Sequence, residues 1–209
     1  MRRPYDSDDD GLNEDTIAPD WLAQFRRWLA DAVAAQLPEP NAMTLATASA
    51  DGRPSARTVL LKSVDADGFT FFTNYTSRKG IELAENPYAS LVFGWFAMHR
   101  QVIVTGRVER LSRPETDAYF VSRPRESQLG AWASPQSQIV ESRATLDRAL
   151  AEVEERFAGE DPLPTPPHWG GLRVRPETVE FWHGRIGRLH DRLRYRHRAG
   201  EWIIERLGP

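Results

Sequence analysis

Hydrophobic residues near the start of the chain recur with the spacing of a helix. The apolar stripe comprises Trp21, Leu22, Phe25, Trp28, Leu29 and Val33. This spacing predicts an amphipathic helix that starts after Asp20 as its N-cap and ends before Pro38. We interpret Trp21 and Trp28 as core residues, because both belong to the stripe. Residues 1–19 are acidic and polar, and we expect them to form a mobile arm.

A series of short strands is predicted after this helix, because hydrophobic segments are separated by turn dipeptides such as Asp-Gly. The expected strands are 42–49, 55–64, 69–74, 88–96, 101–111, 171–174, 178–182, 189–196 and 201–206. Further helices are expected at 77–85, 114–122 and 142–157, and an irregular polar segment at 123–138. The pattern predicts a mainly β fold over residues 20–209, an antiparallel barrel with peripheral helices in a single domain.

Composition narrows the class of protein. The chain has 209 residues, 40% of them hydrophobic, with seven Trp and nine Phe, which excludes a disordered chain. No apolar run approaches the roughly 20 residues of a membrane span, and the start lacks the apolar region of a secretory signal. The absence of cysteine fits a reducing cytoplasm. A net charge of −3 argues against a general nucleic-acid binder, so any cationic function must be local.

Lysine occurs only twice among the 27 cationic residues, as Lys62 in R-T-V-L-L-K and Lys79 in T-S-R-K. Lysine is a compact point charge, whereas arginine is a planar fork. If a helix starts at Ser77, its free N–H groups together with Arg78 and Lys79 would attract an anion. The alternative is a capped, solvated surface helix, and burial distinguishes the two. No G-x-G-x-x-G or P-loop is present, so side chains would have to hold any phosphate.

Two other groups of polar residues are candidates for a site. Arg57 and Lys62 are five positions apart, so both reach one ligand only if a bulge or a strand end intervenes. Arg188, His190 and Arg192 alternate, and on a strand they would share one face and repel each other without a partner. That partner is either an anionic or electron-rich ligand or acidic residues elsewhere in the fold.

The segment 119–137 concentrates polar residues in what reads as a loop, and such loops often carry sites. Its polar residues include Tyr119, Arg123, Arg125, Ser127, Gln136 and Ser137. The alternative is a surface loop anchored by Trp132. The histidines show no H-x-x-x-H or H-E-x-x-H spacing, so we expect no metal site.

Taken in order, these segments resemble the pyridoxamine 5′-phosphate oxidase family. The resemblance runs from about Trp21 to Pro209 and includes R-T-V-L-L-K, T-N-Y-T-S-R-K, R-Q-V-I-V-T-G, S-R-P-R-E-S-Q-L-G-A-W-A-S-P-Q-S, H-W-G-G and R-L-H-D-R. It implies an antiparallel FMN-binding split β-barrel that works as a homodimer, with FMN at the subunit interface and C-terminal strands in dimerisation and the active site. The implied reaction oxidises pyridoxamine or pyridoxine 5′-phosphate with O₂ to pyridoxal 5′-phosphate and hydrogen peroxide.

The resemblance also implies roles for residues that match the family's motifs. The implied FMN contacts are Arg57, Thr58, Val59, Leu60, Phe72, Thr73, Arg78, Lys79, Gln101, Gln136, Ser137, Trp182 and Arg192. The implied contacts of the substrate phosphate are Lys62, Tyr119, Arg123 and Ser127. Arg188 and His190 match the pair over the substrate ring and are the expected catalytic residues. Arg2 and Tyr5 match an arm that folds over the substrate.

Two other functions remain open at this point. One is an oxidase of the same fold that acts on another ring, such as a phenazine precursor. The other is a carrier that binds flavin or pyridoxal phosphate without turnover. The S-R-P-R-E-S and R-L-H-D-R motifs favour the vitamin B6 substrate, because they would supply its phosphate and ring contacts.

Overall fold

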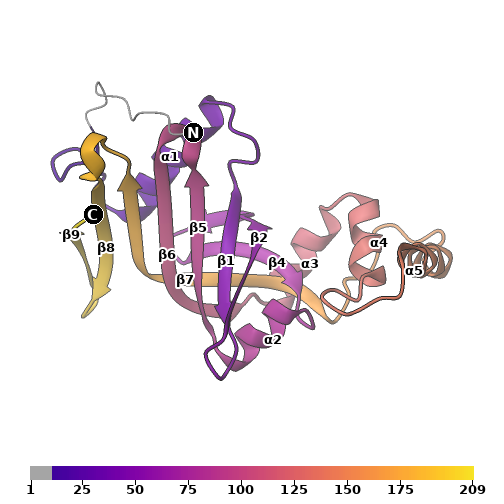
Figure 1. Ribbon diagram of the computed structural model, residues 1–209. Helices are drawn as coiled ribbons and strands as arrows, with labels where there is room; N and C mark the ends of the chain where they lie inside the picture. Colours follow the sequence, from indigo (N-terminus) through magenta and orange to yellow (C-terminus); the bar gives the residue numbers. More distant parts are fainter. Residues whose placement is uncertain (1–10) are drawn as a thin grey trace.

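One antiparallel sheet organises the computed structural model, which describes residues 11–209 (Figure 1). Its strands are β1 Ala42–Ala48, β2 Pro54–Leu60, β3 Ser63–Asp65, β4 Gly68–Asn74, β5 Tyr88–Trp95, β6 Arg100–Arg110, β7 Trp169–His183, β8 Asp191–Arg198 and β9 Glu201–Arg206. The order across the sheet is β2-β1-β5-β6-β7-β4-β3, with β8 added to β7 and β9 to β8. The predicted mainly β, antiparallel fold is confirmed.

The two ends of the sheet meet at a seam between β2 and β3. These strands lie at opposite ends of the strand order, yet only Leu61 and Lys62 separate them in the chain. The sheet therefore curls, and the Lys62 backbone N–H donates to the Thr70 carbonyl at 2.8 Å on the far side of the seam. The single strand expected at 55–64 is wrong, because the chain leaves β2 at Leu60 to make this crossing.

Strand β7 is the longest in the described part of the chain and joins two halves of the sheet. One edge pairs with β6, while the other pairs first with β4 and then with β8. The two strands expected at 171–174 and 178–182 are therefore one continuous strand. The interruption between them contains Pro176, which lacks an N–H, and a register shift between Thr105 and Gly106 of β6 accommodates it.

Helix α1 (Trp21–Ala34) covers the main hydrophobic core, as the spacing of its apolar residues predicted. The Asp20 side chain accepts from the Ala23 N–H at 2.8 Å and so caps the helix. Trp21, Phe25 and Trp28 are buried. Phe25 contacts Phe69 of β4 edge to face, with ring centroids 4.9 Å apart.

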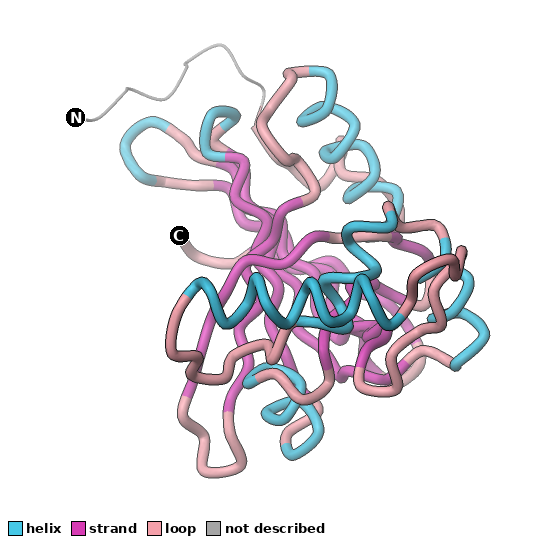
Figure 2. The backbone as a smooth tube through the Cα atoms, turned by 90° about the vertical axis from the view of Figure 1, so that its right-hand side faces the viewer, coloured by secondary structure: helices cyan, strands magenta, loops and turns pink. Residues whose placement is uncertain are grey.

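Three helices form a second unit beside the sheet: α3 (Arg113–Val121), α4 (Arg125–Ala133) and α5 (Arg143–Arg156). Figure 1 shows this unit projecting to the right of the sheet, and Figure 2 shows helices around the strands. Its small core contains Phe120, Leu129, Phe157, Leu163 and Trp169. The irregular segment expected at 123–138 is wrong where α4 forms. That helix buries only Gln128 and Leu129, too few apolar positions to show a helical period.

The N-terminal segment packs against the C-terminal strands from residue 11 onward. Leu12 and Ile17 are buried, and the Leu12 N–H donates to Asp191 at 3.2 Å. Arg206 bridges Glu14 and Asp191, with nitrogen–oxygen distances of 2.7 and 2.8 Å. The prediction of a mobile arm is therefore wrong for residues 11–19. Arg2 and Tyr5, the two residues of the expected lid, lie outside the described residues.

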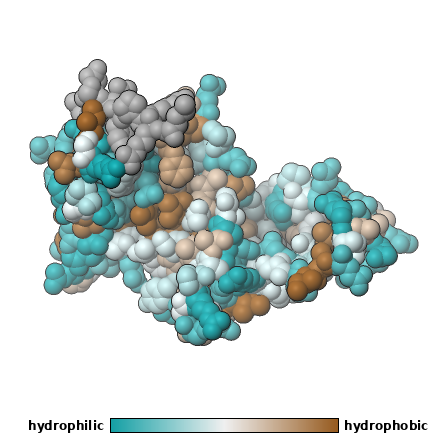
Figure 3. All heavy atoms as spheres, in the orientation of Figure 1, coloured by the Kyte–Doolittle hydropathy of each residue, from teal (hydrophilic) through white to brown (hydrophobic). Residues whose placement is uncertain are grey.

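The surface combines hydrophilic side chains with hydrophobic patches, as the face in Figure 3 illustrates. Large exposed hydrophobic residues include Phe96, Ile139 and Leu189. No helix within residues 11–209 is long and apolar enough to cross a membrane.

Candidate functional site

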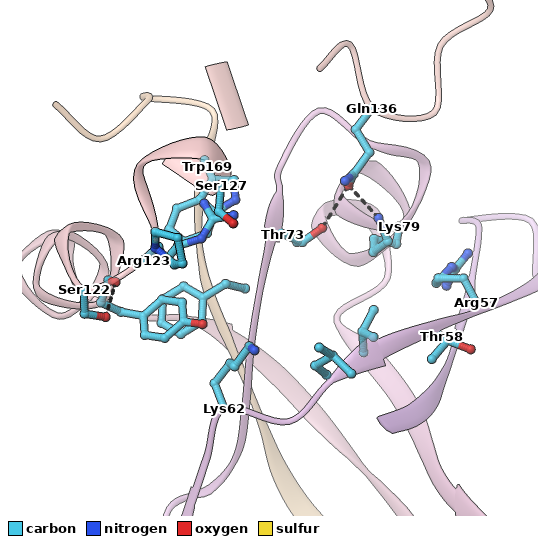
Figure 4. Close-up of a pocket in the computed structure, with 15 residues that line it drawn as sticks. Arg57, Thr58, Lys62, Thr73, Lys79, Ser122, Arg123, Ser127, Gln136 and Trp169 are labelled. Carbon is cyan, nitrogen blue, oxygen red and sulfur yellow. Dashed lines mark hydrogen bonds between the residues drawn. The ribbon is translucent and has the colours of Figure 1, made fainter. Parts of the chain in front are cut away.

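A cavity of about 580 Å³ opens at the seam of the sheet, between α2 (Arg78–Glu85) and helices α3 and α4 of the second unit (Figure 4). This volume is typical of pockets for small organic ligands. The predicted site residues that line it are Arg57, Thr58, Val59, Leu60, Lys62, Phe72, Thr73, Lys79, Tyr119, Arg123, Ser127 and Gln136. Two groups of cations face this cavity. We call Arg57 and Lys79 the α2 cation centre, and Lys62 and Arg123 the α3–α4 cation centre.

Lys79 lies buried at the start of α2, where Ser77 caps the helix by accepting from the Gly80 N–H at 3.3 Å. Its ammonium donates to Ser77 Oγ at 3.1 Å and to Gln136 Oε1 at 2.8 Å, and Thr73 donates to the same amide oxygen (Figure 4). Burial, followed by repulsion from Arg57, lowers the pKa of Lys79 to about 8. A solvated surface helix would leave this ammonium exposed, so that alternative is wrong for Lys79.

Arg57 on β2 completes the α2 cation centre and is held by hydrogen bonds. Its guanidinium donates to the Leu45 carbonyl at 3.2 Å and to Thr47 Oγ1 at 2.6 Å. It also faces the buried Glu82 carboxylate at 3.4 Å. Burial opposes ionisation of Glu82, but hydrogen bonds led by those from Ser55 and Thr47 lower its pKa to about 2. Glu82 is therefore ionised and fixes Arg57 in place.

Arg123 of the α3–α4 cation centre is held differently, by aromatic ring faces. Its guanidinium carbon lies 4.7 Å from the Trp169 ring centroid and 5.7 Å from that of Phe120. Its Nη1 is buried with no hydrogen-bond partner among the described residues. Burial lowers the pKa of Arg123, against an opposing effect of Tyr119. Lys62, exposed beside the seam, is the second cation of this centre.

Phe72, Tyr119 and Trp169 form an aromatic wall of the cavity. The Phe72 and Tyr119 rings stack with centroids 3.9 Å apart, and Phe72 stacks on Trp169 at 5.3 Å. All three residues line the cavity. The cavity thus combines two cationic positions with flat apolar surface, which suits phosphorylated ring compounds.

Three of the expected cofactor contacts lie elsewhere, in register on neighbouring strands: Gln101 of β6, Trp182 of β7 and Arg192 of β8. Gln101 and Trp182, together with Phe96 and His99, line a separate cavity of about 380 Å³. The His190 ring lies 4.7 Å from the Trp182 ring. We call Gln101, Trp182, His190 and Arg192 the strand surface. None of its members lines the cavity at the seam.

The predicted alternation of Arg188, His190 and Arg192 on one strand face is wrong. Strand β8 begins only at Asp191, and Arg188 ends a short 3-10 turn with φ of 65°. His190 Nδ1 accepts from the Arg185 N–H at 3.0 Å. Arg192 pairs with Glu180 at 2.7 Å, which raises the pKa of Arg192, so this residue has an acidic partner within the fold.

Two more expected cofactor contacts do not line the cavity at the seam, Arg78 and Ser137. Arg78 is exposed and pairs with Glu82 at 2.9 Å, and Ser137 is an exposed neighbour of Gln136 with φ of 72°. Among residues 11–209, no three His, Asp or Glu side chains are grouped so that they could hold a metal ion.

The sequence reasoning missed three residues that line the cavity: Ser122, Pro124 and Trp169. Ser122 and Pro124 flank Arg123 in S-R-P, so the prediction of Arg123 as a site residue was the available signal for both. Trp169 belongs to H-W-G-G, one of the segments that carry the family resemblance, but spacing alone gave it no role.

A curled antiparallel sheet with its site at the seam places the protein in the split-barrel class. A family model described as pyridoxamine 5′-phosphate oxidase matches residues 29–157. A second, described as the pyridoxine 5′-phosphate oxidase C-terminal dimerisation region, matches residues 169–209. The chain belongs to the pyridoxamine 5′-phosphate oxidase family, which confirms the resemblance drawn from its motifs.

Relatives and solved structures agree with this assignment. The chain is 60% identical over 100% of its length to a pyridoxine/pyridoxamine 5′-phosphate oxidase from Salinispora arenicola, covering 95% of that protein. It is 64% identical to the protein of the same name from Acidothermus cellulolyticus, over 95% of this chain and 90% of the relative. The crystal structure of PhzG from Burkholderia lata, in complex with tetrahydrophenazine-1-carboxylic acid, has a TM-score of 0.88 at 35% identity and covers 96% of this chain and 98% of PhzG.

A more distant solved structure supports the fold alone. The pyridoxamine 5′-phosphate oxidase-related, FMN-binding protein from Nostoc punctiforme is 20% identical and has a TM-score of 0.71. The alignment covers 93% of this chain and 100% of that protein. The fold expected from the motifs is therefore confirmed.

Proposed function

We propose that the protein is an FMN-dependent oxidase that converts pyridoxamine and pyridoxine 5′-phosphates to pyridoxal 5′-phosphate, with O₂ as the electron acceptor and hydrogen peroxide as a product. The observation that carries this function is the presence of two cation centres in one cavity. Within residues 11–209, neither Lys79 nor Arg123 forms an ion pair. Two cations without carboxylate partners fit two phosphates, one on the cofactor and one on the substrate.

The α2 cation centre is the better match for the FMN phosphate. Lys79 is a buried ammonium at a helix start, where backbone N–H groups also favour an anion. Phe72 and the β2 residues Thr58 to Leu60 line the same cavity and would contact the flavin. Bound FMN supplies the acceptor for two electrons from the substrate and their transfer to O₂.

The α3–α4 cation centre would hold the substrate phosphate, as the motifs imply. Lys62 lies at the seam, and Arg123 lies between α3 and α4 with Ser127 on the same side of the cavity. Ser127 and Tyr119, which also lines the cavity, would add hydroxyl donors. Phosphate anchored at this position fixes the reacting carbon relative to the flavin, which lowers the entropic part of the barrier. Without such an anchor the small pyridine ring would have few fixed contacts.

We infer that a second copy of the chain completes each site. Trp169, in the cavity, and Trp182, on the strand surface, lie near opposite ends of β7, so one chain presents the two surfaces separately. The matched dimerisation region, residues 169–209, contains Trp182, Arg188, His190 and Arg192. A homodimer with a two-fold axis would bring the strand surface of one copy to the cavity of the other. In that arrangement Arg188 and His190 would position the substrate ring and stabilise charge near the reacting carbon.

The direct test uses purified protein. Its visible spectrum should show bound flavin, and pyridoxine 5′-phosphate added under air should yield aldehyde and peroxide in equal amounts. A yellow protein without turnover would contradict the oxidase and favour a carrier.

The role of Arg188 has its own test. Arg188→Ala should lower kcat about 100-fold, because a charge stabiliser is lost, while FMN content stays at the wild-type level. Arg188→Lys is the matched variant that keeps the charge. Equal loss of turnover and FMN in Arg188→Ala would show that Arg188 holds the cofactor instead.

A second candidate is an oxidase for a phenazine-type ring, since the PhzG structure that matches this chain holds tetrahydrophenazine-1-carboxylic acid. That ligand carries a carboxylate and no phosphate. The identities of 60% and 64% to pyridoxine/pyridoxamine 5′-phosphate oxidases, against 35% to PhzG, favour the B6 substrates. Turnover of both substrate classes by one preparation, compared through kcat/KM, decides between the candidates.

A further inference from the structure

The Arg123 side chain is positioned without a single polar contact to the described part of the chain. Its guanidinium makes no hydrogen bond or ion pair there, and its contacts are the ring faces of Trp169 and Phe120. A guanidinium offers five N–H donors around its planar edge. Because Arg123 contacts aromatic rings and no carboxylate, none of these donors is used within the described residues, whereas a carboxylate partner would use two of them.

Trp169 is itself firmly fixed, which makes it suitable as a support. It is the first residue of β7, pairs with Asn74 of β4, and has only 6% of its surface exposed. Phe72 stacks on its ring at 5.3 Å, and Phe120 meets it edge to face at 5.1 Å. Indole gives the strongest cation–π contact among the aromatic side chains.

We propose that Trp169 is a positioning residue for the substrate phosphate: it holds Arg123 by its ring face and keeps the guanidinium edge free for the phosphate oxygens. This inference rests on the proposed function, because it assumes that Arg123 binds the substrate phosphate. Trp169 would therefore raise the affinity for phosphorylated ligands through Arg123, without binding the phosphate itself. Preorganisation of this kind reduces the entropy that the side chain loses when the ligand binds.

The test is a double-mutant cycle on FMN-loaded protein, read by equilibrium binding of pyridoxal 5′-phosphate. Trp169→Leu should weaken binding about tenfold, and Trp169→Phe about threefold, because phenylalanine retains part of the cation–π contact. In an Arg123→Gln background the same Trp169 substitutions should have no further effect. Binding of pyridoxal, which has no phosphate, should change less than twofold in every variant.

Trp132→Phe is the matched control, because Trp132 also carries an arginine on its ring, with Arg156 at 5.0 Å, but does not line the cavity. It should bind pyridoxal 5′-phosphate like the wild type. Equal loss of affinity for pyridoxal and pyridoxal 5′-phosphate in the Trp169 variants, or a full Trp169 effect in the Arg123→Gln background, overturns the proposal. If Trp169→Leu does not fold, Trp169→Phe and its cycle decide alone.

Failure of the proposed function gives a different result. Wild-type protein that binds pyridoxal 5′-phosphate without oxidising pyridoxine 5′-phosphate contradicts the oxidase, and the binding cycle still decides the role of Trp169. Wild-type protein that binds no pyridoxal 5′-phosphate contradicts both. In the oxidase, the same variants should raise KM for pyridoxine 5′-phosphate and leave kcat and FMN content near the wild-type values.

Discussion

The two cation centres carry similar charge but are built in different ways. In the α2 cation centre, Arg57 faces the Glu82 carboxylate, and Lys79 donates to Ser77 and Gln136. In the α3–α4 cation centre, Arg123 lies on aromatic rings with no polar partner in the described chain, and Lys62 is exposed. One centre is a closed polar network, and the other leaves its donors unused.

The difference matches two kinds of ligand. A network of fixed donors is already oriented before an anion arrives, which suits a cofactor that stays bound through many turnovers. Donors held only through ring faces gain most of their polar contacts from the ligand itself, which suits a substrate that enters and leaves. Substitutions that affect one centre and spare the other test this division.

The largest effect is expected from Lys79→Met. Removing the buried ammonium should weaken FMN binding about 100-fold, because charge-assisted hydrogen bonds to the phosphate are lost. Quenching of flavin fluorescence by the apoprotein measures the dissociation constant. Lys62→Met is the matched control and should keep FMN affinity within twofold of the wild type. A large loss of FMN in both variants would mean that the two centres serve one ligand.

Arg123→Gln should act on the substrate instead. We expect KM for pyridoxine 5′-phosphate to rise about 30-fold, because glutamine keeps a polar side chain but loses the charged fork. FMN content, read from the visible spectrum, should not change. A variant that loses FMN in proportion to its activity would place Arg123 in the cofactor site.

The pH dependence of FMN binding tests the α2 cation centre alone. In the apoprotein the pKa of Lys79 is lowered to about 8, so the ammonium is present below that pH and is lost above it. A bound phosphate stabilises the ammonium and raises its pKa. FMN affinity should therefore fall about tenfold per pH unit above pH 8 until the pKa of the complex is reached. Titrations at several pH values measure this slope, and Lys79→Met should abolish it.

The smallest effect is expected from Lys62→Arg. Lys62 is exposed and arginine keeps its charge, so KM for pyridoxine 5′-phosphate should change only about threefold. Steady-state kinetics measure it, with FMN content as the control. An increase as large as that of Arg123→Gln would show that the compact ammonium is required at the seam.

Elements with a strong hydrophobic period were predictable from the sequence. The apolar stripe predicted helix α1, because burial selects those positions, and the Asp-Gly dipeptides predicted the turns of the β1–β2 and β3–β4 hairpins. The two hairpins do not form one meander, because β2 and β3 lie at opposite ends of the strand order. Helix α4 was missed, since Leu129 is its one buried apolar residue and the rest of its packing comes from other segments. The continuity of β7 through Pro176 depends on a register shift in β6, which no local pattern encodes.

The site was predictable in part. Motifs named most residues of the cavity, but the burial of Lys79 depends on Gln136, which lies 57 positions away in the chain. The position of Arg188 depends on a left-handed backbone conformation that arginine rarely adopts, so alternation on a strand was the wrong expectation. Arg123 contacts the ring of Trp169 on β7, and this contact forms only when the chain folds.

The length of β7 has a consequence for hybrid dimers that contain two different variants. Because β7 separates Trp169 from Trp182, each site of the proposed dimer is formed by the cavity of one copy and the strand surface of the other. Arg188 lies two positions before His190 of the strand surface, so we assign it to the same half of the site. A hybrid of one Lys79→Met chain and one Arg188→Ala chain then contains one site with both defects and one with neither. These two impaired variants, refolded together, should therefore regain activity by complementation.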